Sequence, residues 1–233
     1  MLLRHLHLPN LSSYTHASAL QQTLVSAFLA HKASPSTHPA PPPTIITAQF
    51  HPVYTCGRRE LGSVTASQQA FLRSDGRAEF HEALRGGQTT FHGPGQLTAY
   101  PILDLKRHGL SPRCWVHLLE ETVMKTCKHY GIDTRRTENP GVWVDEDRKI
   151  CAVGVHLRRN VSSHGVGLNV STDLWWFNRI VACGLEDKRA TSFEDVGVSG
   201  HEVEEVGGTF VKTLAEGLEG VDGVEAVREQ GLG

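Results

Sequence analysis

Residues 85–96 constrain this chain of 233 residues more than any other stretch, because these twelve positions hold four glycines and one proline. Such a composition is incompatible with a helix interior and unfavourable in a central strand. Glycine permits positive φ and lets a ligand come close to the backbone, and Pro94 between two glycines stiffens the bend. Apolar residues flank the stretch at 80–84 and 97–103. The pattern therefore predicts a strand, a shaped loop and a second strand.

The shaped loop presents polar side chains around a fixed backbone, namely Arg85, Gln88, Thr89, His92 and Gln96. Two familiar nucleotide-binding loops are excluded. No Gly-Lys-Ser or Gly-Lys-Thr follows at the spacing of a Walker loop. The stretch also lacks the strand, GxGxxG and helix order of a dinucleotide-binding fold. A loop whose glycines are only structural stays open at this point.

The string RGGQTTFHGPGQLTAYPILDL, which begins at Arg85, resembles the signature of the lipoyl(octanoyl) transferases of the LipB family. Three further segments match that family: YTCGRR from Tyr54, RKICAVG from Arg148, and HGVGLNV from His164 with ACGL from Ala182. The resemblance runs from about residue 51 to residue 193. It implies transfer of an octanoyl group from acyl carrier protein, through a cysteine thioester, to a lysine of a lipoyl domain in lipoate biosynthesis.

In that family a lysine and a cysteine form a catalytic dyad, and Lys149 and Cys183 occupy those positions here. The pair suits acyl transfer, because a cysteine thiolate is a strong nucleophile when its pKa is lowered. A nearby ammonium favours the thiolate, and the same lysine when neutral can accept a proton from the incoming amine. Cys151 is the rival nucleophile, but it lies in an expected apolar strand and is interpreted as a core residue.

By the same resemblance, three segments bind the acyl substrate. Their residues are Arg85, Gly86, Gly87, Gln88, Thr89, Thr90, Phe91 and His92, then Ala152, Val153 and Gly154, and then His164, Gly165, Val166 and Gly167. His92 and His164 are candidates for shaping the pocket or holding the thioester carbonyl, and a structural role for both stays open. Cys56 stands where the family has an apolar residue, and we expect it to be buried. Gly167 replaces the usual alanine, which would widen the pocket.

Strands and helices mix without regular βαβ alternation, which indicates the α+β class. The resemblance adds a single octanoyltransferase catalytic domain over residues 1–233, with a mixed sheet flanked by helices as in the biotin and lipoate protein ligases. We expect helices at 13–31, 67–74, 111–131 and 202–218, a short helix capped by Ser171 or Thr172, and strands at 44–50, 141–144, 149–155 and 164–170. Residues 51–59 are expected to be a loop, residues 34–43 a Pro-rich surface loop, and residues 220–233 a frayed tail.

Composition narrows the functional classes. The formal net charge of −2 argues against general nucleic-acid affinity, and no apolar run approaches 18 residues, so we expect no membrane span. Five cysteines without a CxxC pair favour a reducing compartment. Fourteen histidines are scattered and form no HExxH motif, so we expect no metal and no cofactor. The resemblance implies a mitochondrial location if the source is eukaryotic and a cytoplasmic one if it is bacterial.

The expected partners are octanoyl-acyl carrier protein as donor, and lipoyl domains of 2-oxoacid dehydrogenase complexes and the glycine cleavage H protein as acceptors. Such partners are acidic and this chain is nearly neutral, so we expect a local basic rim. Its candidate residues are Arg58, Arg59, Arg158 and Arg159. Three alternatives stay open: an ATP-dependent lipoate or biotin ligase, an octanoyl amidotransferase of the same fold, and a non-catalytic binding module. The lack of a ligase-type adenylate loop argues against the first, and the intact lysine and cysteine argue against the third.

Overall fold

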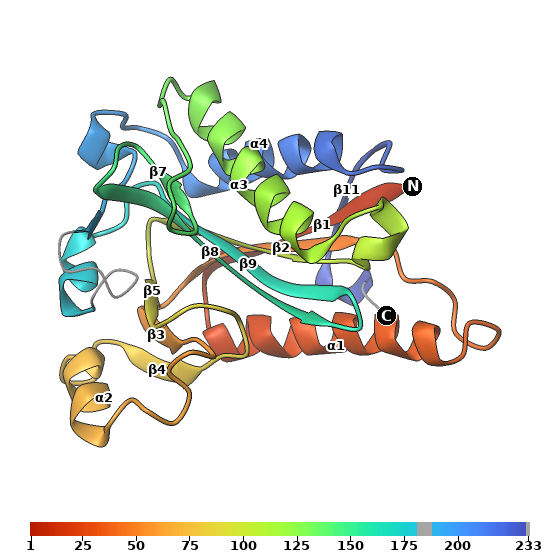
Figure 1. Ribbon diagram of the computed structural model, residues 1–233, viewed down its shortest axis with the longest axis horizontal. Coiled ribbons are helices and arrows are strands. Elements are labelled where there is room, and N and C mark those ends of the chain that lie inside the picture. The colour runs from red at the N-terminus through yellow and green to blue at the C-terminus, as the bar shows by residue number, and fades with distance from the viewer. Residues whose placement is uncertain (181–187, 232–233) are drawn as a thin grey trace.

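The main β-sheet runs through the middle of the molecule (Figure 1). The structure is a computed structural model that describes residues 1–180 and 188–231. Within these residues the main sheet has eight strands in the order β10-β8-β9-β6-β2-β1-β11, with β7 beside β8. The strands are β1 (Leu2–Ser12), β2 (Thr44–Phe50), β6 (Gln96–Ile102), β7 (Val142–Trp143), β8 (Arg148–Arg158), β9 (Val161–Asn169), β10 (Arg189–Ala190) and β11 (Gly223–Val227). Strand β1 is parallel to β2 and β11, β10 is parallel to β8, and the other pairs are antiparallel.

Helices cover both faces of this sheet (Figure 1). Helices α3 (Pro112–His129) and α4 (Val203–Gly217) share one apolar core with the sheet, and α1 (Tyr14–Ala33) shares another. Short 3-10 helices are η1 (Leu105–His108), η2 (Leu174–Arg179), η4 (Glu194–Val196) and η5 (Glu229–Gly231). The predicted mixed sheet flanked by helices is therefore confirmed. No helix in the described ranges combines the length and the apolar character needed to cross a bilayer.

Helix α3 forms where the sequence predicts it, and its ends show why. The Ser111 side chain accepts a hydrogen bond from the backbone N–H of Cys114, and a proline occupies the first turn. Gly131, at φ +80°, follows the last turn and takes the left-handed conformation that ends a helix. Trp115, Leu119 and Val123 are fully buried at a spacing of four residues, so this face packs on the sheet.

A smaller sheet of three strands, in the order β4-β3-β5, lies below the main sheet in Figure 1. Its strands are β4 (Glu79–Glu82), β3 (Val53–Cys56) and β5 (Thr90–His92), and α2 (Ala66–Arg73) packs beside it. The Phe91 ring of β5 stacks on the Trp176 ring of η2 with centroids 5.1 Å apart. The loop between β4 and β5 contains residues 85–89 of the glycine-rich stretch, and the Gly86 backbone N–H joins it to β8 of the main sheet.

Two expectations about this small sheet were wrong. Residues 51–59 are not only loop, because β3 lies within them, and the glycine-rich stretch contains β5. Both strands are short and bounded by proline or glycine, so turn signals conceal them in the sequence.

The helix after residue 172 is the 3-10 helix η2, and its N-cap is Asp173, whose carboxylate accepts a hydrogen bond from the backbone N–H of Trp175 at 2.9 Å.

Both chain ends also differ from expectation. No element was assigned to residues 1–12, yet β1 occupies them, and the tail expected to fray contains β11. Strand β11 is mostly exposed and is held by backbone pairing to β1. The Met1 ammonium also donates to the carbonyl oxygen of Gly220 at 2.7 Å and pairs with Asp222 at 2.6 Å. The edge strand β11 is mostly exposed, so it leaves little alternation in the sequence. Strand β1 lies between β2 and β11, but Pro9 and Asn10 interrupt its pattern where the register shifts between His7 and Leu11.

Candidate active site

A cavity of about 320 Å³ is lined by strands β6, β8 and β9 and by the loop between β4 and β5. This volume lies at the lower end of the roughly 300–1,000 Å³ range of small-molecule sites. Most of the predicted site residues line it: Arg85, Gly86, Gly87, Gln88, Thr89, Thr90, His92, Lys149, Ala152, Val153, Gly154, Gly165, Val166 and Gly167. Three predicted site residues are not among them. Phe91 and His164 lie elsewhere, and Cys183 falls outside the described residues.

The strand register brings two of the sequence motifs together. Strands β8 and β9 are antiparallel, and Ala152 faces Gly167, Val153 faces Val166, and Gly154 faces Gly165. Strand β6 completes the wall, because Thr98 is the partner of Gly167 on the other side. The two motifs therefore form one continuous surface of the cavity although they are distant in the sequence.

The Arg85 side chain holds the glycine-rich loop in place. Its guanidinium donates to the Thr55 hydroxyl and carbonyl oxygens, and to the carbonyl oxygens of Gly86 at 3.0 Å and Gln88 at 2.9 Å. Burial lowers the pKa of this guanidinium. Because its donors are used within the protein, Arg85 supports the cavity wall and has little capacity left for a substrate.

Close backbone approaches explain why glycines recur around this loop. A Cβ atom on Gly57 would lie 2.2 Å from the carbonyl oxygen of Gly87, which is sterically impossible. A Cβ atom on Gly154 would lie 3.0 Å from the carbonyl oxygen of Gly86. The Gly86 backbone N–H donates to the carbonyl oxygen of Val155 at 3.0 Å. The glycines therefore let the loop lie directly against β8.

The tautomer of His92 follows from its neighbours. Gln96 donates its side-chain N–H groups to the Phe91 carbonyl oxygen at 3.2 Å and to Oδ1 of Asn169 at 2.9 Å. Asn169 in turn donates to the carbonyl oxygen of Thr191 at 2.9 Å. Flipping Gln96 would set its oxygen against those acceptors, so Oε1 faces Nδ1 of His92 at 2.7 Å. Nδ1 of His92 is therefore the donor, and Nε2 carries a lone pair.

His92 is buried and neutral at physiological pH. Burial, followed by the nearby Arg85 cation, lowers its pKa to about 4. A lone pair on Nε2 accepts a hydrogen bond and repels a carbonyl oxygen. His92 therefore suits the first of its candidate roles, shaping of the cavity, or acceptance of a substrate N–H. Its tautomer does not suit the second candidate role, holding a thioester carbonyl.

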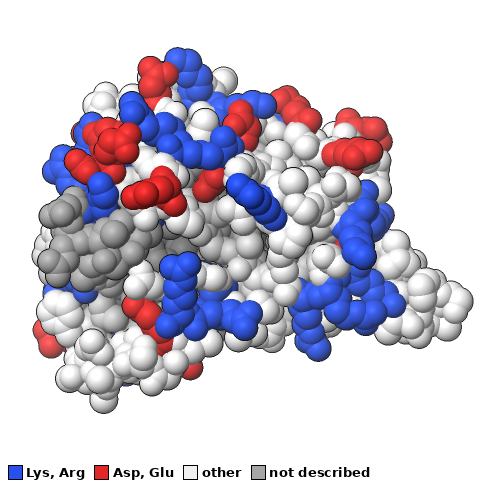
Figure 2. Space-filling model, in the orientation of Figure 1, with Lys and Arg blue, Asp and Glu red and all other residues white. Residues whose placement is uncertain are grey.

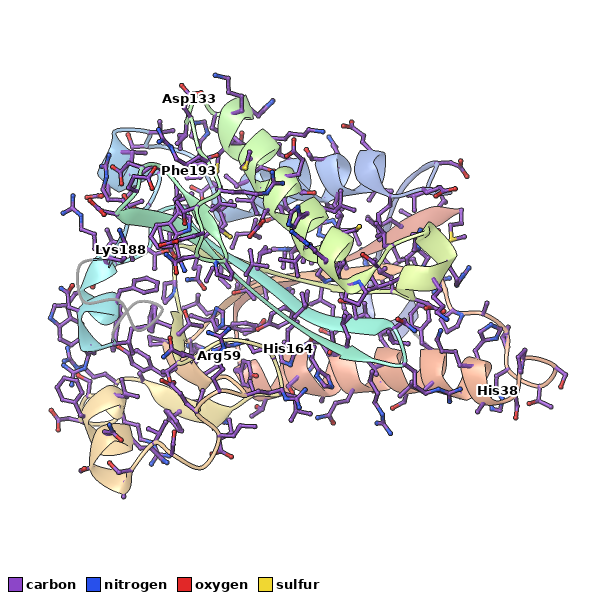
Figure 3. The ribbon with its side chains drawn as sticks, viewed as in Figure 1. His38, Arg59, Asp133, His164, Lys188 and Phe193 are labelled. Atoms are coloured by element: carbon purple, nitrogen blue, oxygen red, sulfur yellow. The ribbon has the colours of Figure 1, made fainter. Side chains whose placement is uncertain are left out.

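Two predicted site residues point away from the cavity. Phe91 is buried against Tyr54 and Trp176 in the core of the small sheet, because successive residues of a strand face opposite sides. His164 lies between the main sheet and α1, with its ring on Tyr100 and its backbone N–H donating to Oε1 of Gln21 at 2.7 Å (Figure 3). Burial, and then Arg85, lowers the pKa of His164 to about 3. Its φ of +56° is unusual for a residue other than glycine.

Lys149 extends into the cavity from the start of β8. Its side chain is largely buried, and Nζ donates to the carbonyl oxygen of Pro140 at 3.0 Å. Nζ also lies 4.5 Å from the centroid of the Trp143 ring, a distance at which an aromatic face attracts a cation. Gly141 has no room for a side chain, since a Cβ atom there would lie 2.6 Å from the Cys151 carbonyl oxygen. The ammonium thus has a defined position at the wall of the cavity.

Cys151 is a core residue, as the sequence predicted. It is fully buried, and burial raises the pKa of its thiol well above the usual value. A protonated thiol is a poor nucleophile. Cys56 is also fully buried, as expected. In the part of the chain that the structure describes, no three His, Cys, Asp or Glu side chains come together as a metal site.

The sequence reasoning missed several lining residues. Gln96, Tyr100 and Asn169 lie within the recognised motifs, so the strand alternation could have identified them. Asn139 and Pro140 belong to the turn before β7 and carry no local signal of their own. The others are Val116, Val155, Phe177, Ile180 and Ala190.

Basic side chains lie beside the cavity and at the turn between β8 and β9, where Arg159 donates to the carbonyl oxygen of Lys32. Arg59 lines the cavity, and Figure 2 shows Lys and Arg side chains around the position that Figure 3 labels Arg59. Arg58 and Arg158 lie near His156, and their charges, after burial, lower its pKa. Among the described residues, Arg58, Arg59, Arg158 and Arg159 form no ion pair with a carboxylate. This arrangement leaves positive charge at the surface.

The fold and the glycine-rich cavity wall are those of a known catalytic domain. Residues 13–215 match the model of the lipoyl protein ligase A/B catalytic domain, and the chain belongs to that family. Two solved structures share the fold. Lipoate-protein ligase A bound with ATP superposes with a TM-score of 0.70 at 14% identity, covering 99% of this chain and 91% of the other. A bi-partite lipoate protein ligase from Thermoplasma acidophilum gives 0.65 at 14% identity, with 98% and 88% covered.

Within that family the chain is one of the octanoyltransferases. It is 54% identical over 189 residues to a Schizosaccharomyces pombe protein named "Probable octanoyltransferase", covering 81% of this chain and 83% of the relative. It is 46% identical over 168 residues to the human mitochondrial octanoyl-[acyl-carrier-protein]:protein N-octanoyltransferase LIPT2, with 71% of each chain covered. The octanoyltransferase of Acidobacterium capsulatum is 40% identical over 208 residues, with 83% and 80% covered.

Proposed function

We propose that this protein transfers an octanoyl group from octanoyl-acyl carrier protein to a lysine of a lipoyl domain, with Cys183 as nucleophile and Lys149 as acid and base. The observation that carries the proposal is the position of Lys149. Its ammonium lies at the wall of a cavity that three of the family motifs enclose, against the Pro140 carbonyl oxygen and the Trp143 ring. No cofactor is required, because the donor thioester already supplies an activated acyl group.

The transfer takes place in two half-reactions. In the first, the Cys183 thiolate, whose proton has passed to Lys149, attacks the donor carbonyl; a new C–S bond forms and the donor C–S bond breaks. The carrier thiolate leaves and takes the proton from Lys149. In the second, the acceptor amine attacks the acyl-cysteine, a C–N bond forms and the C–S bond breaks. Lys149 then accepts the amine proton and delivers it to the departing Cys183 thiolate.

The cavity offers the acyl chain an apolar wall. Val153 and Val166 face each other across β8 and β9, and Tyr100 and Phe177 contribute aromatic surface. Burying the chain there removes apolar area from water, which stabilises the complex by roughly 25 cal/mol per Å². Fixing the chain also orients the carbonyl group for attack.

The names of the relatives support a proposal for the partners and the location. The human relative is named for an acyl carrier protein donor and a protein acceptor and is mitochondrial. We propose octanoyl-acyl carrier protein as donor, and lipoyl domains of 2-oxoacid dehydrogenase complexes and the glycine cleavage H protein as acceptors. A mitochondrial location is proposed if the source is eukaryotic, and a cytoplasmic one if it is bacterial.

Intact-mass analysis tests the proposal directly. The full-length protein is mixed with octanoyl-acyl carrier protein without acceptor, and the adduct is mapped by peptide sequencing. We expect one octanoyl group on Cys183 and its loss when a lipoyl domain is added. An adduct on Cys151, or full turnover by Cys183→Ala, would overturn the assignment.

A further inference from the structure

We propose that Glu120 is a positioning residue for Lys149. It fixes the turn at residues 139–141, whose Pro140 carbonyl oxygen holds the Lys149 ammonium. The inference rests on the proposed function, because it matters only if Lys149 carries the proton. Glu120 itself does not line the cavity, and it acts through the backbone of that turn.

Glu120 is a buried carboxylate on α3, with 5% of its surface exposed. Its Oε1 atom accepts a hydrogen bond from the backbone N–H of Gly141 at 3.0 Å, and Oε2 accepts one from Nε of Arg136 at 3.0 Å. Hydrogen bonds to an ionised carboxylate are about twice as strong as neutral ones. Both carboxylate oxygens therefore have a partner, and the buried charge is compensated.

The turn that Glu120 binds provides the hydrogen-bond acceptor for the Lys149 ammonium. Pro140 precedes Gly141, and its carbonyl oxygen accepts the hydrogen bond from Nζ of Lys149 at 3.0 Å. The indole N–H of Trp143 donates to the Asn139 carbonyl oxygen at 3.1 Å, so the turn is fixed on both sides of Pro140. The ring of Trp143 lies under the same ammonium.

The turn needs an external contact to hold this shape. Gly141 has φ of +118°, which residues with side chains rarely adopt, and its position leaves no space for a Cβ atom. A glycine is also the residue that loses most conformational freedom on folding. The bond from its N–H to Glu120 therefore selects one backbone conformation from many, and that conformation directs the Pro140 carbonyl at Lys149.

Loss of the Glu120 carboxylate would displace the Pro140 carbonyl oxygen and the Lys149 ammonium bound to it. The Gly141 N–H would lose its acceptor in a buried location, and the turn would relax to satisfy it. A misplacement of about 1 Å at a catalytic group can lower a rate by about 10²-fold. Substrate binding to the apolar part of the cavity would be unaffected, so kcat should fall while KM for the donor stays nearly constant.

Glu121 provides a matched control on the same helix. It also binds Arg136, at 3.1 Å from Nη2, but it makes no bond to the turn and is partly exposed. Glu121→Ala therefore removes a carboxylate partner of Arg136 and leaves Gly141 bound. Glu120→Gln is the conservative variant, because a carboxamide oxygen can still accept from the Gly141 N–H.

The experiment compares Glu120→Ala, Glu120→Gln and Glu121→Ala in the full chain, using octanoyl-acyl carrier protein and a lipoyl domain. We expect kcat to fall about 10²-fold in Glu120→Ala, with KM for the donor within two-fold of wild type. Glu120→Gln should recover most of that loss, and Glu121→Ala should stay within two-fold. Equal losses in Glu120→Ala and Glu121→Ala, or a normal kcat in a destabilised Glu120→Ala, would overturn the inference.

A second variant keeps the proposal testable if Glu120→Ala fails to fold. Trp143→Phe retains an aromatic face under Lys149 but loses the N–H that binds the Asn139 carbonyl oxygen. It should lower kcat about 10-fold at constant KM, since one of the two anchors of the turn is lost, and an unchanged kcat would contradict the inference. Failure of the proposed function is recognised separately, because Lys149→Ala would then retain activity.

Discussion

Gly167 lies so close to Gln96 that a Cβ atom on residue 167 would be 3.0 Å from Oε1 of Gln96. The same Cβ atom would lie 3.4 Å from Cε1 of His92. These two side chains form the hydrogen-bonded pair that fixes the histidine tautomer. A methyl group at this position would therefore project into the cavity and press on its polar wall.

We predict that Gly167→Ala folds normally and shortens the acyl chain that the enzyme prefers. One methylene in an apolar pocket is worth about 1–3 kcal/mol, or roughly 10- to 200-fold in kcat/KM. The measurement compares kcat/KM for hexanoyl, octanoyl and decanoyl carrier proteins, and decanoyl transfer should fall most. Gly165→Ala is the contrasting variant: its Cβ atom would lie 2.2 Å from the Ala99 carbonyl oxygen, so it should lower the melting temperature instead. A uniform loss over all three chain lengths in Gly167→Ala would contradict the prediction.

The buried histidines predict that the protein loses stability in mild acid. Burial lowers the pKa of His92 to about 4 and that of His164 to about 3. An unfolded histidine titrates near 6.5, so between these values the unfolded state binds more protons. The contribution of each histidine to the free energy of unfolding should therefore be fully present above pH 6.5. It should fall as the pH drops, by roughly 2 kcal/mol per histidine between pH 7 and pH 5. Urea denaturation across this range measures it.

His164→Asn separates one of these contributions. Asparagine tolerates the positive φ of residue 164 better than most residues, so the backbone can stay as it is. The variant should show a shallower dependence of stability on pH between 4 and 6, because one titrating group is gone. An unchanged slope would mean that His164 does not titrate with unfolding.

The basic side chains beside the cavity and at the turn between β8 and β9 predict a salt-sensitive encounter with the donor. Arg158→Glu combined with Arg159→Glu should lower the association rate of octanoyl-acyl carrier protein by about 10-fold or more at low salt, without changing the melting temperature. Lys212→Glu, on the exposed side of α4, is the matched control and should have little effect. Stopped-flow association at several salt concentrations distinguishes them. An on-rate insensitive to both salt and mutation would exclude this surface from donor recognition.

The shared fold raises a specific question about nucleotide use, since a similar solved structure is a lipoate-protein ligase bound with ATP. We predict transfer from octanoyl-acyl carrier protein with no ATP and no magnesium. Adding both to the protein with free octanoate and a lipoyl domain should give no octanoylated product. Product that depends on ATP would assign the protein to the ligases.

Much of the fold could be predicted, because the helices and central strands carry their own periodicity. Residues Thr44–Phe50 form a strand with the predicted boundaries, and α3 begins at its predicted cap. The strands that were missed, β1, β3, β5, β10 and β11, are short, exposed or interrupted by turn residues. Their pairing depends on backbone groups that a sequence pattern does not display.

The sequence predicted the part of the site whose residues lie within contiguous motifs. Fourteen of the predicted residues line one cavity, but Phe91 and His164 do not, because a motif treated as a continuous lining ignores which side of a strand each residue faces. Glu120 and Pro140 were beyond reach of sequence reasoning. They act on Lys149 through contacts between α3, a loop and β8, which only the tertiary structure brings together.

Loss of the lysine should be severe. Lys149→Ala should fold, because Trp143 and Cys151 beneath it remain packed, and its activity should fall by about 10²–10⁴-fold, the usual loss for a general acid–base group. Steady-state octanoylation of a lipoyl domain measures the loss, and thermal denaturation checks the fold. Activity within ten-fold of wild type would remove Lys149 from the mechanism.

The central claim is that Lys149 serves both half-reactions, as an ammonium and as a neutral amine. Lys149→Arg separates the two roles, because arginine keeps the charge beside Pro140 but does not release its proton at working pH. Rapid-quench mixing with octanoyl-acyl carrier protein and a lipoyl domain counts acyl-enzyme and product in the same samples. We predict that Lys149→Arg forms acyl-enzyme at a reduced rate and accumulates it, with transfer to the acceptor slowed at least 10²-fold. Both half-reactions at wild-type rates would contradict the account and leave the lysine as an electrostatic neighbour only.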